Sequence, residues 1–331
     1  MFNLLKLFVK HLKFLTALIS FVVLSYNCNS IVKSSIEDVN TPIDAKKLYN
    51  KILSYDEGKF ILFNELISRL NESNVIFIGE SHNSKQAHKY QYKILSSLYK
   101  MDKRIAVTLE MFERDVQVFL DKYLSGKISE SVFLAHVRPW KNYSTDYRPI
   151  IEFAKAHKLK VIAMNTPNGI SKKVIKSGKN AILKLNKLEK SFIAKKINFN
   201  DNQYKKYFYG SLPKNHPGIE KHKAMIRKFF IASLIKDATM AESIVLFLKK
   251  PEYVSYKLIS INGKFHSDYG IAIPKMVKSL KPNVKVIIIS LVPVSEKDKI
   301  ILKNYLSKKI ADFIIFTDDS KSYTLKILAV S

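Results

Sequence analysis

The chain has 331 residues, and its 56 Lys and Arg outnumber its 28 Asp and Glu to give a net charge of +28. This length allows one large domain or two small ones, and the charge is typical of proteins that bind nucleic acid, a membrane surface or an anionic ligand. The lysines are spread along the whole chain and no basic run is interleaved with a nucleic-acid motif, so the sequence disfavours nucleic acid as a partner.

The first 28 residues have the pattern of an export signal. Lys6, Lys10 and Lys13 precede a largely apolar stretch of eleven residues, Phe14–Leu24, which is well short of the roughly 20 needed to span a bilayer. The chain's single cysteine, Cys28, follows after three more residues. Because one cysteine cannot form an internal disulfide, lipidation of Cys28 explains its presence in an exported chain.

The alternative is an ordinary cleaved signal with an incidental cysteine, because Asn27 stands where Gly, Ala or Ser usually precedes a lipidated cysteine. The lipoprotein interpretation predicts a signal peptide over 1–28, a polar tether over 29–45 and a single domain over 46–331. It also predicts an exported bacterial lipoprotein held in the cell envelope, at the outer membrane or the periplasmic face, by its lipid anchor.

Short apolar runs alternate with helical patterns along most of the chain. Residues 46–70 have mixed, helix-like spacing. The runs at 75–78, 105–109, 160–164, 258–261 and 284–291 read as buried strands. We expect a helix at 297–309 and two final antiparallel strands at 313–316 and 324–329. The alternation predicts an α/β fold with a mostly parallel open sheet flanked by helices.

The alternation stops between residues 169 and 251. This stretch shows helical patterns at 180–196, 221–236 and 237–249, with a loop at 202–218 that carries Tyr204, Tyr207 and Tyr209. We therefore expect a helical insertion of roughly 80 residues over one face of the sheet.

Two of the predicted strands end in the same pattern, Gly79-x-x-His82 and Gly263-x-x-His266. Glu80 belongs to the first of them, and Glu110 ends a third strand. Since ligands of open parallel sheets bind beyond the carboxyl ends of the strands, we expect Glu80, His82, Glu110 and His266 to meet at one rim. Such a set suits a divalent transition metal or general acid–base catalysis. A buried structural ion pair is the competing interpretation.

Several short motifs in the same order resemble those of the ChaN-like lipoproteins, in a superfamily with Tiki-type proteins and erythromycin esterases. The resemblance covers about residues 60–280. It rests on GESHNSKQAHKYQ (Gly79–Gln91), LEMF (Leu109–Phe112), Trp140 with Tyr147-Arg-Pro149, VIAMNTP (Val161–Pro167), KDATMAESI (Lys236–Ile244) and INGKFHSDYGIAIP (Ile261–Pro274).

The resemblance implies a haem-binding lipoprotein of the iron-uptake type, with haem held by tyrosine between the subunits of a homodimer. Tyrosine serves as an axial haem ligand in some proteins, so Tyr204, Tyr207 and Tyr209 are the candidate ligands, and lysines suit the propionates.

Tiki-like relatives imply an alternative, a metal-dependent hydrolase of peptidase or esterase type that uses Glu80, His82, Glu110 and His266. Asn83 and Ala87 depart from the family pattern, which usually has Asp and His at these positions, whereas His88 matches it. A binding scaffold with a purely structural rim is a third interpretation. Whether the protein is an enzyme stays open at this point.

Overall fold

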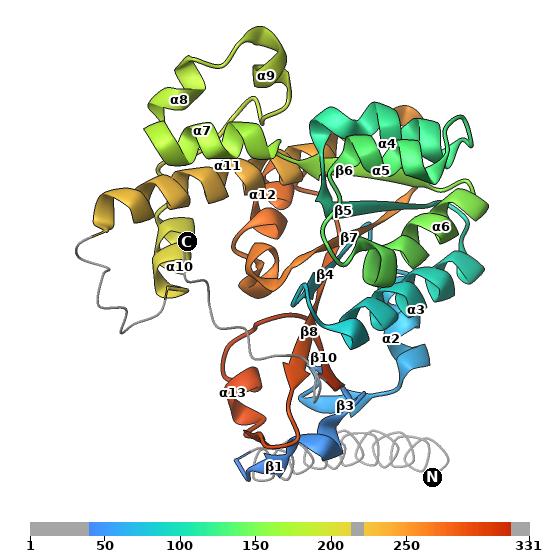
Figure 1. The fold of residues 1–331 in the computed structure, drawn as a ribbon. Coiled ribbons are helices and arrows are strands. Elements are labelled where there is room, and N and C mark those ends of the chain that lie inside the picture. Colours follow the sequence, from blue (N-terminus) through green and yellow to red (C-terminus); the bar gives the residue numbers. More distant parts are fainter. Residues whose placement is uncertain (1–39, 213–221, 319–331) are drawn as a thin grey trace, which may run out of the picture.

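The computed structural model describes residues 40–212 and 222–318. Eight strands form one sheet in the order β3-β2-β10-β8-β4-β7-β5-β6, and β1 pairs with β9 (Figure 1). The strands are β1 (Ile43–Asp44), β2 (Ile52–Ser54), β3 (Lys59–Ile61), β4 (Val75–Glu80), β5 (Ile105–Glu113), β6 (Lys160–Asn165), β7 (Lys257–Gly263), β8 (Val286–Val294), β9 (Lys299–Ile300) and β10 (Phe313–Asp318). From β10 to β6 every pair is parallel, which confirms the expected fold class.

Helices cover both faces of the large sheet (Figure 1). One face packs against α2 to α6, and the other packs against α12 and the second half of α11. The helices are α2 (Phe63–Leu70), α3 (Lys85–Met101), α4 (Gln117–Leu124), α5 (Glu130–Val137), α6 (Arg148–Ala156), α7 (Asn168–Ser177), α8 (Asn180–Leu183), α9 (Lys187–Ser191), α10 (Asn202–Gly210), α11 (Lys223–Leu248), α12 (Ile273–Leu280) and α13 (Lys303–Leu306).

The central strands are apolar because they are buried on both faces. Along β4, Ile76 and Ile78 face the core under α3, whereas Val75 and Phe77 face the core under α11 and α12. This follows from the two-residue repeat of a strand. Each such side chain stabilises the fold by about 1.5–3 kcal/mol. Because β4, β7 and β5 are adjacent parallel strands, their carboxyl ends form the middle of one rim of the sheet.

The edge beyond β10 differs from the sequence prediction. Residues 46–70 contain strands β2 and β3 before the short helix α2, and β2 rather than a C-terminal strand is the antiparallel neighbour of β10. The expected strand at 324–329 lies outside the described residues. The helix expected at 297–309 is only α13, preceded by β9.

The insertion is helical, and no strand occurs in its described residues, 169–212 and 222–251. Its helices α7, α8 and α10 and the first half of α11 share a separate apolar core. Residues 202–210 form helix α10 rather than a loop, because Asp201 caps it by accepting a hydrogen bond from the Tyr204 amide at 3.0 Å.

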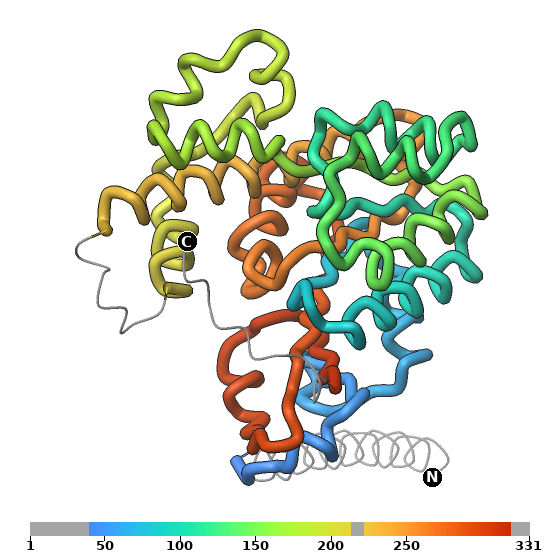
Figure 2. The backbone as a smooth tube through the Cα atoms, in the orientation of Figure 1, coloured from blue at the N-terminus to red at the C-terminus, as the bar shows by residue number. Residues whose placement is uncertain are grey.

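Residues 223–248 form a single helix, α11, instead of two (Figure 2). The break expected between Lys236 and Asp237 is absent because the Asp237 side chain is buried and hydrogen-bonded, not solvated. The helix joins the insertion core at one end to the sheet at the other.

The predicted signal peptide and Cys28 lie outside the described residues, as does most of the predicted tether. The last residues of that tether belong to the fold, because Ile43–Asp44 forms β1 and Ala45 is buried. Over 40–212 and 222–318, no helix has both the length and the apolar character that a membrane crossing needs.

Candidate functional site: the rim of strands β4, β7 and β5

The glycines of the two G-x-x-H motifs are required by the close approach of the two strand-end loops. A Cβ at Gly263 would lie 2.9 Å from both Cε1 and Nε2 of His82. A Cβ at Gly79 would lie 2.7 Å from Ser267 Oγ and 3.2 Å from Lys264 Cα. Each motif's glycine therefore makes room for the loop of the other motif, which explains why the pattern occurs twice.

The carboxylate of Glu80 is buried at the end of β4 and is surrounded by hydrogen-bond donors. Gln91 donates to Oε2 and the Tyr147 hydroxyl donates to Oε1. His82 Nδ1 lies 3.0 Å from Oε1, and His88 Nδ1 lies 3.2 Å from Oε2. With these partners the group is held rigidly in place.

His82 is more open than His88, because 42% of its side chain is exposed and only 3% of the His88 side chain is. Its ring meets Trp140 edge to face, with ring centroids 4.5 Å apart. Burial of part of the ring lowers the pKa of His82, but the hydrogen bond with Glu80 and the charge of Glu110 outweigh it, so the pKa lies above its usual value.

His266 is enclosed between two carboxylates. Nδ1 is hydrogen-bonded to Asp237 on α11, and Nε2 lies 3.3 Å from Glu110 Oε1 on β5. Burial alone would lower the pKa of His266, but the two acids raise it to about 10. The side chain therefore carries a positive charge at neutral pH.

Glu110 is held by the same contacts and by a backbone bond, because Gly263 N donates to Oε2 at 2.8 Å. Burial raises the pKa of Glu110, but His266, His82 and this amide together hold it well below the usual range. The buried carboxylate therefore remains ionised.

All four predicted rim residues, Glu80, His82, Glu110 and His266, lie together at the carboxyl edge of the sheet, as the strand-end positions predicted. Over the described residues, however, no group of three His, Cys, Asp or Glu side chains has the arrangement of a metal site. The predicted metal site is therefore not supported. The side chains satisfy one another, and the exposed ring of His82 is the part of the rim best placed to exchange a proton.

The three candidate haem tyrosines have very different surroundings. Tyr204 is fully buried, and its hydroxyl donates to Asp237. The hydroxyl of Tyr207 donates to the Phe265 carbonyl oxygen at 2.9 Å, and burial raises its pKa far above the usual value. Tyr209 is 38% exposed, and its ring stacks on Phe230. Of the three, Tyr209 is exposed, Tyr207 is partly buried and Tyr204 is buried.

Tyr209 shares a face of α10 with two lysines, because Lys205 and Lys206 lie four and three residues before it. Both lysines are exposed, and within the described parts of the chain neither has an ion-pair partner. We call Lys205, Lys206 and Tyr209 the α10 face. It combines an exposed phenol with two positive charges.

Sequence reasoning did not assign a role to Asp237, Tyr147 or Gln91. Asp237 follows Lys236 within a largely apolar run, and this charged pair predicts a boundary between two helices rather than a buried acid. Tyr147 and Gln91 lie within motifs of the family resemblance, but nothing in their local sequence shows that both reach Glu80.

The sequence of this chain matches a known protein family. The model of a family described as haem-binding uptake, Tiki superfamily, ChaN matches residues 66–277. The chain belongs to this family.

Two solved structures are similar to this chain. ChaN of Campylobacter jejuni, whose structure is described as showing cofacial haem binding, has a TM-score of 0.58 at 19% identity, over 80% of this chain and 95% of that chain. An erythromycin esterase in its open conformation has a TM-score of 0.43 at 11% identity, over 74% of this chain and 77% of that one. The ChaN likeness shows the shared fold, and the esterase likeness is too distant to bear on function. No curated protein matches the sequence.

Proposed function

We propose that this protein is an exported, membrane-anchored haem-binding protein that serves iron acquisition. Membership of the ChaN family supports haem as the ligand. The single observation that carries the proposal is the α10 face, where one exposed tyrosine stands beside two lysines without ion-pair partners over 40–212 and 222–318.

We assign Tyr209 as the axial ligand because its surroundings differ from those of the other two tyrosines. A phenolate must reach iron with its oxygen, and the hydroxyls of Tyr204 and Tyr207 are already engaged with Asp237 and the Phe265 carbonyl oxygen. The Tyr209 side chain is exposed on its helix. Lys205 and Lys206 would receive the two propionates, which are carboxylates of the kind lysine pairs with at a surface.

Haem supplies a ferric iron that accepts an oxygen ligand such as tyrosinate. The chain's own contribution is to hold that oxygen at the α10 face and to neutralise the propionates. We further propose, from the family resemblance, that the haem-loaded protein is a homodimer. Sedimentation of loaded and haem-free protein tests this, and an unchanged mass on loading would refute it.

Haemin titration of the purified protein tests the assignment. We expect a saturable shift of the Soret band, with affinity reduced at least tenfold in Tyr209→Phe. Tyr207→Phe is the matched control on the same helix and should bind as the wild type does. A flat titration of folded wild-type protein would refute haem binding, and equal binding by Tyr209→Phe would refute the ligand.

The anchoring part of the proposal rests on the sequence, since Cys28 is the only cysteine and follows an apolar run. One acyl chain binds membranes only marginally, so stable anchoring requires more than one. Labelled palmitate should enter the wild type and not Cys28→Ala. Equal labelling of both, or labelling of neither, would contradict lipidation.

A second candidate function, a hydrolase of peptidase or esterase type, is favoured by the half-exposed ring of His82 beside the paired acids of the rim. In this candidate His82 exchanges the proton and Glu80 orients its ring. Turnover of a panel of ester and peptide substrates should be nearly abolished in His82→Ala, whereas haem binding should persist. An undiminished rate in that variant would exclude the rim as the catalytic site.

A further inference from the structure

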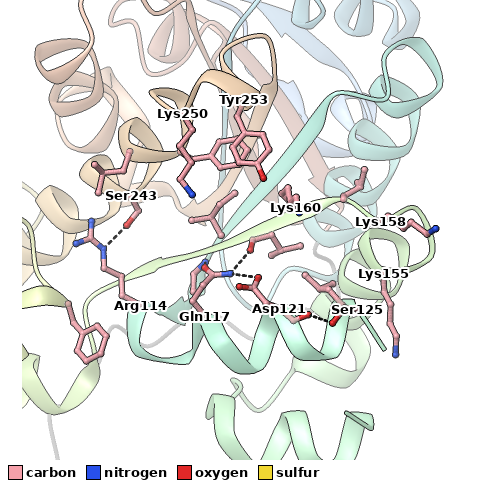
Figure 3. Close-up of a pocket in the computed structure, with 18 of the residues that line it drawn as sticks. Arg114, Gln117, Asp121, Ser125, Lys155, Lys158, Lys160, Ser243, Lys250 and Tyr253 are labelled. Atoms are coloured by element: carbon pink, nitrogen blue, oxygen red, sulfur yellow. Dashed lines mark hydrogen bonds between the residues drawn. The ribbon is translucent and has the colours of Figure 1, made fainter. Parts of the chain in front are cut away.

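A cavity of about 1220 Å³ runs along the outer edge of β6, the last strand of the large sheet. It is larger than the roughly 300–1,000 Å³ of most small-molecule pockets. Figure 3 shows β6 crossing it, with Gln117 and Asp121 of α4 on one side and Lys250 and Tyr253 on the other. The shape suits an extended ligand that follows the strand.

One side chain already makes the hydrogen bonds of a missing neighbour strand. Gln117 Oε1 accepts from the Ala163 amide at 2.7 Å, and Gln117 Nε2 donates to the Val161 carbonyl oxygen at 3.0 Å. These backbone groups belong to alternate residues, so they point outward from the sheet in the same direction. The edge of β6 therefore binds an amide group placed in the plane of the sheet.

The charges around this edge are mostly positive. Four lysines line the cavity, and none of them has an ion-pair partner within 40–212 and 222–318; they are Lys155, Lys158, Lys160 and Lys250. Arg114 also lines the cavity but is paired with Glu242 at 3.0 Å. Asp121 is the only acid in the lining. Lysines on an edge strand oppose pairing with another copy of a chain that carries +28, and they favour an acidic partner.

The cavity also has apolar surface for the side chains of such a partner. Leu246 on α11 is 50% exposed, and the partly buried rings of Phe192 and Tyr253 complete the lining. In an added strand, alternate side chains would meet these apolar groups while the others meet the lysines.

We propose that the edge of β6 binds an extended acidic segment of a partner protein by strand addition. The backbone of that segment bonds to β6 beside Gln117, as in other complexes that extend a sheet, and its carboxylates pair with Lys160 and Lys250. This site is separate from the α10 face and from the rim.

The probe is a fluorescent eight-residue peptide of alternating Glu and Val, titrated into the purified full-length protein. We expect saturable binding, and at least tenfold weaker binding of a twin peptide methylated on every second backbone nitrogen. Methylation removes the ladder hydrogen bonds but keeps every charge. Equal binding of the two peptides would refute strand addition, and absence of saturable binding would refute the site.

Charge-reversal variants locate the interaction. The double variant Lys160→Glu with Lys250→Glu should bind the peptide at least tenfold more weakly. The control double variant Lys89→Glu with Lys100→Glu changes the net charge equally at exposed positions of α3 and should bind as the wild type does. Equal weakening in both would show that net charge alone is responsible, which would overturn the proposal. Amide hydrogen exchange over 159–163 should slow on binding.

Discussion

The rim and the α10 face both collect polar side chains, but they use them in opposite ways. At the rim, His266 lies between Asp237 and Glu110, and Glu80 is surrounded by its donors, so the charges are satisfied within the protein. On the α10 face, Tyr209 and the two lysines before it are exposed. A dense cluster of ionisable residues is therefore not by itself the best ligand site. The ionisable groups of the rim are bonded to one another, whereas the side chains of the α10 face are exposed and can contact a ligand.

Because the rim charges are paired inside the protein, Asp237→Ala should destabilise the fold strongly. This change removes one of the two acids beside the charged His266, which keeps only Glu110, and it removes the carboxylate that accepts from the Tyr204 hydroxyl. Breaking a buried pair in this way costs about 3–5 kcal/mol of unfolding free energy, measured by urea unfolding.

Asp56→Ala is the matched control, because Asp56 pairs with Lys309 at 3.2 Å on the surface. Exposed ion pairs contribute about 0–1 kcal/mol. If Asp237→Ala costs no more than Asp56→Ala, the rim is not the internally satisfied network described above.

The two strand-end glycines should respond unequally to alanine. At Gly79 the new Cβ meets the backbone of Lys264, which cannot move freely, so Gly79→Ala should cost about 1–3 kcal/mol. At Gly263 it meets the half-exposed ring of His82, which can rotate outward. Gly263→Ala should therefore cost less but should lower the pKa of His82, because the bond with Glu80 is lost.

Thermal unfolding and NMR titration of His82 measure these two effects. Gly169→Ala is the control, since its Cβ would meet nothing within 4 Å. An unchanged His82 pKa in Gly263→Ala would show that the ring does not depend on the close approach of the two loops.

A smaller effect is expected in the pH dependence of stability. His266 faces Asp237 on α11, Glu110 on β5 and the ring of His82 on the loop after β4, and its pKa is raised to about 10. A raised histidine pKa stabilises the folded state fully below the unfolded value of about 6.5, and this contribution is lost as the pH rises through the folded value. The stability difference between wild type and His266→Gln should therefore shrink from pH 6.5 to above pH 10.

Urea unfolding of both proteins at several pH values measures this difference, and the titration of groups distant from His266 cancels in it. A difference that stays constant over that range would mean that His266 is not charged in the folded protein.

The sequence predicted the parallel sheet and the rim because both follow from local patterns. Buried strands are continuous apolar runs, and Glu80, His82, Glu110 and His266 lie at or just after their ends. It missed β2 and β3, which have three residues each and no clear alternation. It also could not rank the three tyrosines, because the partner of each hydroxyl comes from a segment distant in sequence.

Resonance Raman spectroscopy of the haem-loaded protein distinguishes haem bound at the α10 face, as we propose, from haem bound at the rim. Iron–phenolate vibrations should be present in the wild type and in His82→Ala, and absent from Tyr209→Phe. Phenolate vibrations that persist in Tyr209→Phe, or a histidine-ligated spectrum that is lost in His82→Ala, would contradict binding at the α10 face.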